Sequence, residues 1–419
     1  MLRLGAVLTA LLLVASFDAA AAVKAITFGK LWDGHRTIAN ATVVVDGDKI
    51  VSVTANGGAP PGAERIDLSG YTGLPGLIDS HTHMTFYWDP NSGTNPLRQP
   101  PRHVAVRVFL AKANALKTLE AGVTTVRDLN AFDGADLAMR DLIAMGAMTG
   151  PRMYVSGTGI RDNMYRHPGT DSVAEAVKLT KAIIASGADW VKIYASTGIA
   201  DDVTGNQTVT YDEMKAIIDT AHAAGKKVAI HSYGPAAAKD AIRLGTDTLE
   251  HATDMDDATI AELARKRIWY VPTINHNQHY VDRADDVYKF TPEAKAGLQS
   301  FIQRNFVTAQ KAYKAGVRML VGSDAVYTAF GLNMHELRWF VKMGMSNEQA
   351  LQSATVLPAE MLGKDKSLGA IAPGYIADLV AVEGDPLRDI EVVTGKVRWV
   401  MKAGAVVVDK TRTIKGEKQ

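Results

Sequence analysis

The stretch Leu74-Pro75-Gly76-Leu77-Ile78-Asp79-Ser80-His81-Thr82-His83 decides the fold that the sequence predicts. It is an apolar run that ends in two histidines one residue apart. Because side chains at positions i and i+2 of a strand share a face, His81 and His83 converge at the C-terminal end of the strand. Two converging imidazoles form half of a metal site. The alternative is two unrelated polar residues at a strand end, and ligand-type residues that follow later strands argue against it.

From Leu74 onward, short apolar strands alternate with amphipathic helices. Eight strand–helix units of this kind predict an α/β fold, a parallel (β/α)₈ TIM barrel over residues 74–365. A doubly wound open sheet is the alternative. It is disfavoured because no Gly-x-Gly-x-x-Gly motif follows the first strand. After the His-x-His strand, the expected strands are 124–129, 152–156, 190–195, 227–232, 248–251, 269–273 and 318–324.

Both ends of the chain have β patterns instead. Two β-branched runs flank Asp46-Gly47-Asp48 and predict a hairpin. After about Leu368 the β pattern returns, and neither end has enough strands to stand alone. We therefore expect residues 23–73 and 366–419 to join into one small β-sandwich domain.

Composition limits the function classes. The 419 residues carry a net charge of +1 with a pI of about 7.9, which offers no electrostatic reason to expect a nucleic-acid partner or an acidic membrane surface. The absence of cysteine excludes disulfides and thiolate metal sites. Any metal must be held by nitrogen and oxygen.

The first 22 residues have the pattern of a secretory signal peptide. Arg3 provides a positive start, 7–14 are a short apolar core, and 19–22 are small residues suited to cleavage. An uncleaved anchor is the alternative, although the apolar core is too short to span a bilayer comfortably. We expect a periplasmic or secreted mature chain with no membrane association after cleavage.

Further ligand-type side chains occur where later strands end, and in a barrel these ends face the active site. A lysine among histidines is unusual, since an ammonium group repels a cation. It is either a salt-bridge partner or a carbamate formed with CO₂, whose two oxygens could bridge two metals. The carbamate is favoured because four neutral imidazoles and one carboxylate would leave two divalent cations far from neutralised. With the first two histidines, the set is His81, His83, Lys192, His231, His251 and Asp324.

The motif 73–83, together with Lys192, His231, His251 and Gly322-Ser323-Asp324, resembles the amidohydrolase superfamily. The segment 368–380 is similar to the closing β-sandwich signature of that superfamily. Residues 191–193 and 231–234 resemble the branch of Xaa-Pro dipeptidases (prolidases) and carboxypeptidase-like enzymes. These segments also resemble imidazolonepropionase, but the lysine of the fourth strand favours the peptidases, which bind two metal ions.

The resemblance implies two divalent metal ions, with zinc as the default. His81 and His83 would bind the first together with Asp324, His231 and His251 would bind the second, and carbamylated Lys192 would bridge them. Two such ions lower the pKa of a shared water and polarise the scissile carbonyl. Asp324 would accept the proton of the water and pass it to the leaving nitrogen. Related enzymes are often homo-oligomers.

Candidate substrate-binding residues are less specific. Tyr233 shares the face of His231 if the strand continues, and its phenol could donate to an oxyanion or a carboxylate; a packing role is the alternative. Arg161, Arg166 and His167 follow the third strand and could receive a carboxylate. Their loop lacks the Gly-Gly-His pattern expected in similar enzymes. His276, after the seventh strand, could line the pocket.

The sequence therefore predicts a binuclear metal-dependent hydrolase of small molecules. It would use a metal-bridged hydroxide to cleave dipeptides, with proline favoured at the C-terminal position, or N-acyl amino acids, including ochratoxin-like amides. A cyclic-amide hydrolase or deaminase is the second hypothesis, and Lys192 discriminates because deaminases of the superfamily usually lack it. A non-catalytic binding protein is the third hypothesis. Such a protein would normally have lost some of the metal-binding residues, and no such loss is visible in this sequence.

Overall fold

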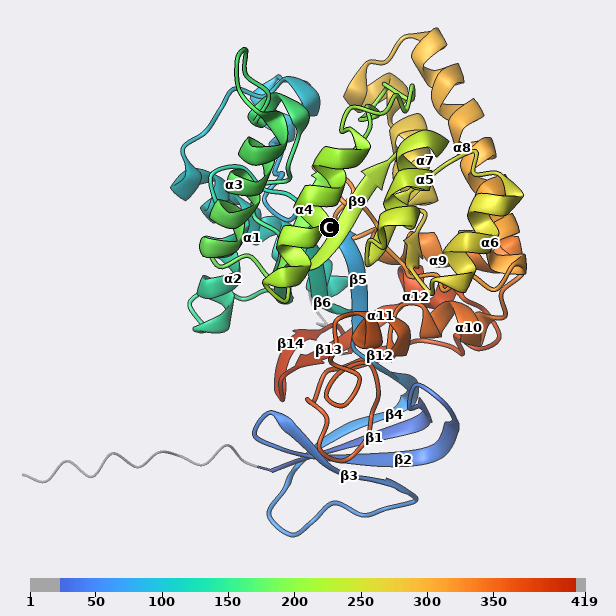
Figure 1. Ribbon diagram of the computed structural model, residues 1–419. Helices are drawn as coiled ribbons and strands as arrows, with labels where there is room; N and C mark the ends of the chain where they lie inside the picture. Colours follow the sequence, from blue (N-terminus) through green and yellow to red (C-terminus); the bar gives the residue numbers. More distant parts are fainter. Residues whose placement is uncertain (1–22, 412–419) are drawn as a thin grey trace, which may run out of the picture.

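The computed structural model describes residues 23–411 (Figure 1). The predicted signal peptide lies outside the described residues. Within residues 23–411, no helix is both long and apolar enough to cross a membrane.

Strands from both ends of the chain form one seven-stranded sheet in the order β14-β13-β12-β4-β1-β2-β3. The predicted hairpin is confirmed, because β2 and β3 pair antiparallel across the turn at Gly47. Apolar side chains of β1, β2, β12 and β13 pack into one core that includes Phe28, Val43 and Trp399. Strands from both ends thus lie in one hydrogen-bonded sheet, and the β-sandwich domain stays a prediction. Its strands are β1 (Lys24–Trp32), β2 (Thr37–Asp46), β3 (Lys49–Ala55), β4 (Glu64–Pro75), β12 (Leu379–Val382), β13 (Val397–Lys402) and β14 (Ala405–Asp409).

Gly76 joins this sheet to the strand that carries the first histidines. Its amide donates to the carbonyl of Asp378, and a Cβ at position 76 would lie only 2.2 Å from Oγ1 of Thr124 and 2.7 Å from Cβ of Asp378. Only glycine allows this close approach. The chain therefore leaves β4 and enters β5 (Leu77–Thr82) at a fixed position.

The rest of the fold alternates strands and helices, as predicted. The strands form two parallel sheets, in the orders β5-β6-β7 and β11-β10-β9-β8. Backbone bonds join the sheets at one edge, where the amide of Ile160 donates to the carbonyl of Lys192 and the amide of Tyr194 to that of Ile160. The remaining strands are β6 (Val123–Asp128), β7 (Arg152–Val155), β8 (Trp190–Tyr194), β9 (Lys227–Ser232), β10 (Thr248–His251) and β11 (Trp269–Val271).

The other edge is joined by residues 318–325, which include the predicted eighth strand at 318–324. The prediction of a regular strand is wrong, since this segment makes only isolated bridges to Tyr270 and Thr82. The physical reason is that a side chain interrupts the ladder: the carboxylate of Asp79 accepts from the amide of Ser323 at 2.9 Å. The segment still connects β11 to β5, because the amide of Leu320 donates to Tyr270 and that of Ser80 to Val321.

Helices pack around the two parallel sheets, and the seven-stranded sheet lies at one end of the molecule (Figure 1). Several helices end in glycine with left-handed backbone, such as Gly245 after α5 and Gly344 after α9. The helices are α1 (Val104–Glu120), α2 (Ala135–Ala144), α3 (Ser172–Ala185), α4 (Tyr211–Ala223), α5 (Pro235–Leu244), α6 (Asp257–Arg265), α7 (Ile274–Asp282), α8 (Pro292–Lys314), α9 (Glu336–Met343), α10 (Asn347–Gln352), α11 (Val356–Met361) and α12 (Glu391–Gly395). Short helical turns are η1 (Pro90–Ser92), η2 (Pro96–Arg98), η3 (Asp162–Met164), η4 (Ala284–Tyr288) and η5 (Asn333–His335).

Candidate metal centre

A cavity of about 420 Å³ opens where the parallel strands end. The predicted metal ligands come from β5 and the residue that follows it, from β8, β9 and β10, and from the segment 318–325, which are far apart in the sequence. The structure therefore brings together all six side chains that the sequence predicted as metal ligands: His81, His83, Lys192, His231, His251 and Asp324.

Asp324 is the carboxylate at the centre of this group. Its Oδ1 lies 3.0 Å from Nε2 of His83 and 3.5 Å from Nε2 of His81, and its Oδ2 lies 3.4 Å from Nε2 of His276. Although burial raises the pKa of Asp324, the surrounding imidazoles lower it well below its usual value. Ligand atoms of His81, His251 and Asp324 all lie within 4.8 Å of one another, so these three residues could hold one metal ion.

The imidazoles lie close together in one cluster. The ring centroids of His231 and His251 are 4.6 Å apart, and those of His81 and His251 are 5.2 Å apart. Burial lowers the pKa of all three histidines, and the nearby Lys192 lowers those of His81 and His231 further; the pKa of His81 falls to about 4. The rings are thus neutral near pH 7, which is the form that binds metals.

Lys192 is fully buried, and within residues 23–411 its Nζ has no hydrogen-bond partner. Nε2 of His81 and Nε2 of His231 are likewise buried and have no hydrogen-bond partner among the described residues. Native proteins rarely leave buried polar groups without a partner, so several such nitrogen atoms around one cavity fit a site that binds a cation. Burial lowers the pKa of Lys192 to about 8, against the opposing effect of Glu250 and Asp324. This donor set fits a cation, with nitrogen and oxygen ligands suited to zinc, manganese or cobalt.

Three of the four histidines have a partner at Nδ1 that the sequence did not identify. Nδ1 of His81 lies 2.8 Å from Oε2 of Glu250, and Oε1 of Glu250 accepts from Arg127 at 2.9 Å. Nδ1 of His251 lies 2.6 Å from Oγ1 of Thr273, and Nδ1 of His83 faces a backbone carbonyl at 3.2 Å. Such partners fix the tautomer and orientation of metal-binding histidines. The only sequence signal for Glu250 is that it precedes His251.

The backbone is strained at three positions of the centre. His251, Thr273 and Asp324 have φ of 68°, 50° and 49°, in the left-handed region that non-glycine residues rarely adopt. At His251 this conformation has a clear effect. Strand alternation predicts opposite faces for Glu250 and His251, yet both contact His81. The strain therefore serves to direct the imidazole into the cavity.

Three of the predicted substrate-binding residues line the cavity, namely Tyr233, Arg161 and His276. The ring of Tyr233 stacks on that of His231 at 5.0 Å, and its hydroxyl lies 3.5 Å from Oδ1 of Asn277. The guanidinium of Arg161 lies 3.5 Å over the ring of Tyr194, another residue that the sequence did not identify.

The structure does not bring Arg166 and His167 to the cavity. Arg166 forms ion pairs with Glu213 and Asp162, which hold its guanidinium away from the metal centre. His167 is exposed in the loop between η3 and α3. Of the three loop residues predicted to receive a carboxylate, only Arg161 is placed to do so.

Comparison with known proteins gives the family of this chain. Residues 72–407 match the model of the Amidohydrolase family, so the chain belongs to that family. The ochratoxinase of Aspergillus niger is 28% identical over 358 residues, covering 76% of this chain and 72% of that protein.

Two solved structures have the same fold over nearly the whole chain. One is an Xaa-Pro dipeptidase with methionine bound in its active site, with a TM-score of 0.83, 29% identity and coverage of 92% of this chain and 99% of the other. The other is a prolidase complexed with N-methylphosphonate-L-proline, with a TM-score of 0.82, 30% identity and coverage of 92% and 100%.

Proposed function

We propose that this protein is a binuclear metal-dependent amide hydrolase that cleaves dipeptides or N-acyl amino acids with a free carboxylate. The observation that carries the proposal is the buried, unpartnered amine of Lys192 among four histidines and Asp324. The chain's similarity to Xaa-Pro dipeptidases and to an ochratoxinase, which are hydrolases, supports it. In this proposal the two parallel sheets and segment 318–325 are one closed (β/α)₈ barrel with the site at its C-terminal mouth.

His81, His83 and Asp324 would hold one divalent cation, His231 and His251 the other, and Lys192 both. For that role the neutral amine of Lys192 adds to CO₂ and loses one proton, giving a carbamate with two oxygen ligands. The lowered pKa of Lys192 makes the neutral amine accessible near neutral pH. The cations supply Lewis acidity and lower the pKa of water.

The other side chains orient the substrate and move one proton. Asp324 takes the proton of the attacking water and delivers it to the leaving amine nitrogen, so that the amide C–N bond breaks. Arg161 binds the free carboxylate by charge-assisted hydrogen bonds. Tyr233, whose pKa is raised by burial, keeps its proton and donates a hydrogen bond to the carbonyl oxygen or to the carboxylate.

The test is a hydrolysis screen of a dipeptide and N-acyl amino acid library, with metal content measured on the same sample. We expect turnover of substrates with a free C-terminal carboxylate and about two metal ions per chain. A second candidate is cyclic-amide hydrolysis, since an imidazolonepropionase of Streptomyces avermitilis is 24% identical over 376 residues. Turnover of cyclic amides alone would overturn the peptidase proposal in its favour.

We also propose that the chain is exported to the periplasm or medium after removal of residues 1–22. Cell fractionation and N-terminal sequencing of the mature protein test this. A full-length N-terminus in the cytosolic fraction would contradict it.

A further inference from the structure

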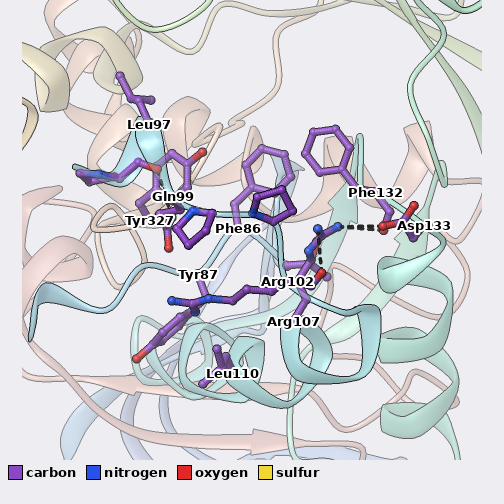
Figure 2. Close-up of a pocket in the computed structure, with 14 residues that line it drawn as sticks. Phe86, Tyr87, Leu97, Gln99, Arg102, Arg107, Leu110, Phe132, Asp133 and Tyr327 are labelled. Carbon is purple, nitrogen blue, oxygen red and sulfur yellow. Dashed lines mark hydrogen bonds and ion pairs between the residues drawn. The ribbon is translucent and has the colours of Figure 1, made fainter. Parts of the chain in front are cut away.

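A second cavity, of about 380 Å³, lies directly beside the metal centre. The two cavities share four lining residues: Phe86, Leu97, Phe132 and Tyr327. Figure 2 shows this second cavity with Phe86 and Tyr327 near its middle, Phe132 toward one end and Leu110 below. Its remaining wall is rich in proline, with Pro96, Pro100 and Pro101. The second cavity, which we call the annex, therefore adjoins the cavity of the metal centre along these shared side chains.

A row of stacked rings leads from a candidate ligand into this annex. The ring of His83 stacks on that of Phe86 at 5.1 Å, and Phe86 stacks on Phe132 at 5.5 Å with only 7° between the ring planes. Tyr327 packs against Phe86 from another side at 5.9 Å. Phe132 is 47% exposed, which is unusual for so large an apolar side chain. Stacked, partly exposed rings form a surface on which a further planar ring could stack.

The walls of the annex are tied together by Arg107 of α1. Its guanidinium donates to the carbonyl of Phe132 at 3.2 Å and to the carbonyl of Arg102 at 3.4 Å, and it pairs with Asp133 at 3.6 Å (Figure 2). These contacts connect three separate segments: the loop before α1, α1 itself and the loop after β6. The annex is therefore a built cavity with fixed walls.

We propose that this annex binds the acyl part of the substrate and selects planar aromatic acyl groups. The inference rests on the proposed function, since it assumes a scissile amide at the metal centre. Ring contacts lead from His231 through Tyr194 to Arg161, where the carboxylate would bind, and from His83 to Phe86 and the annex. An N-aroyl amino acid has its carboxylate and its ring on the two sides of the amide, which matches this order.

The test compares two substrates that differ only in the acyl group: N-acetyl and N-(2-naphthoyl) derivatives of the amino acid that the library screen prefers. We expect a higher kcat/KM for the naphthoyl compound. Phe132→Ala and Leu110→Ala should each lower the naphthoyl-to-acetyl ratio of kcat/KM about three- to tenfold, the effect of one lost aromatic or apolar contact. Phe109→Ala is the matched control, because Phe109 is also on α1, is 74% exposed and does not line the annex.

The outcomes separate this inference from the proposed function. If acetyl compounds or dipeptides are hydrolysed and naphthoyl compounds are not preferred, the inference fails and the proposed function stands. An unchanged ratio in both variants also overturns the inference. If no amide is hydrolysed, the proposed function fails. The role of the annex is then tested by measuring the Kd of the naphthoyl compound for the Asp324→Asn variant, with and without Phe132→Ala. An equal Kd in the two proteins would overturn the inference.

Discussion

The carboxylate of Glu250 lies 2.8 Å from Nδ1 of His81, and its second oxygen accepts from the guanidinium of Arg127 at 2.9 Å. All three side chains are fully buried. Burial alone would raise the pKa of Glu250, but Arg127 and His81 lower it to about 2, so the carboxylate stays ionised. An ionised acceptor holds the Nδ1 proton of His81 and leaves Nε2 free for a metal.

Glu250→Gln should weaken metal binding about 10- to 100-fold, because an amide orients the imidazole less firmly than a carboxylate. It should also lower the free energy of unfolding by about 3 kcal/mol, since Arg127 loses its buried counter-charge. Metal titration and urea denaturation measure the two effects. Glu383→Gln is the control, because Glu383 pairs with Arg398 at the surface and should contribute about 1 kcal/mol or less. Unchanged metal affinity in Glu250→Gln would contradict the orienting role.

His81 was predicted from the sequence and its partner Glu250 was not, and this difference has a physical reason. Strand alternation and strand ends are local patterns, so they identified His81, Lys192 and the other ligands. Glu250 could not be found in this way, because the left-handed backbone at His251 breaks the alternation of β10. Its partner Arg127 lies on a different strand, 123 residues away in the sequence.

The same limit applies to the loops. Arg161 and Arg166 lie in the same loop, and no sequence pattern shows which of them faces the cavity. The position of Arg166 depends on its contact with Glu213, which is 47 residues away in the sequence. The eighth strand was predicted from its apolar residues, but the side chain of Asp79 takes the place of a ladder bond. These features depend on side-chain contacts between residues far apart in the sequence, and the periodicity of apolar residues gives no information about such contacts.

Lys192→Ala should empty the metal centre. The variant loses the bridging ligand, and activity should fall on the order of 100-fold or more, because the metals supply several kcal/mol of transition-state stabilisation. Acetate or propionate should restore part of the metal content by replacing the carbamate oxygens. Lys227→Ala is the control, since Lys227 donates to the carbonyl of Met361 outside the cavity. Full metal occupancy in Lys192→Ala would rule out a bridging carbamate.

Arg161→Gln should weaken recognition of the free carboxylate. We expect kcat/KM to fall about 10- to 100-fold for a substrate with a C-terminal carboxylate, the effect of losing charge-assisted hydrogen bonds, and to change little for the matching carboxamide. The ratio of the two values is the measurement. Arg166→Gln, in the same loop, should lower stability by removing the pair with Glu213 while leaving that ratio unchanged. An equal loss for carboxylate and carboxamide in Arg161→Gln would assign Arg161 a packing role instead.

Glu336→Gln should change how stability depends on pH. The buried carboxyl group of Glu336 accepts from the amides of Ile274 and Asn275, at the start of the helix that carries His276. Burial raises its pKa from 4.5 to about 8, against the opposing effect of these hydrogen bonds. Between these two values the folded protein binds more protons than the unfolded chain. The contribution of Glu336 is therefore fully present below pH 4.5 and is lost as pH rises to about 8.

The glutamine variant lacks this titration, so its stability relative to the wild type should increase from pH 5 to pH 8 by a few kcal/mol, at most about 1.4 kcal/mol per pH unit. Loss of the carboxylate acceptor changes the free energy of unfolding by the same amount at every pH. The informative quantity is therefore the slope of the stability difference against pH. Urea denaturation at several pH values measures it, with Glu383→Gln as the exposed control. A constant difference across this range would show that Glu336 is already ionised in the folded protein, held by the two amides and the helix N-terminus.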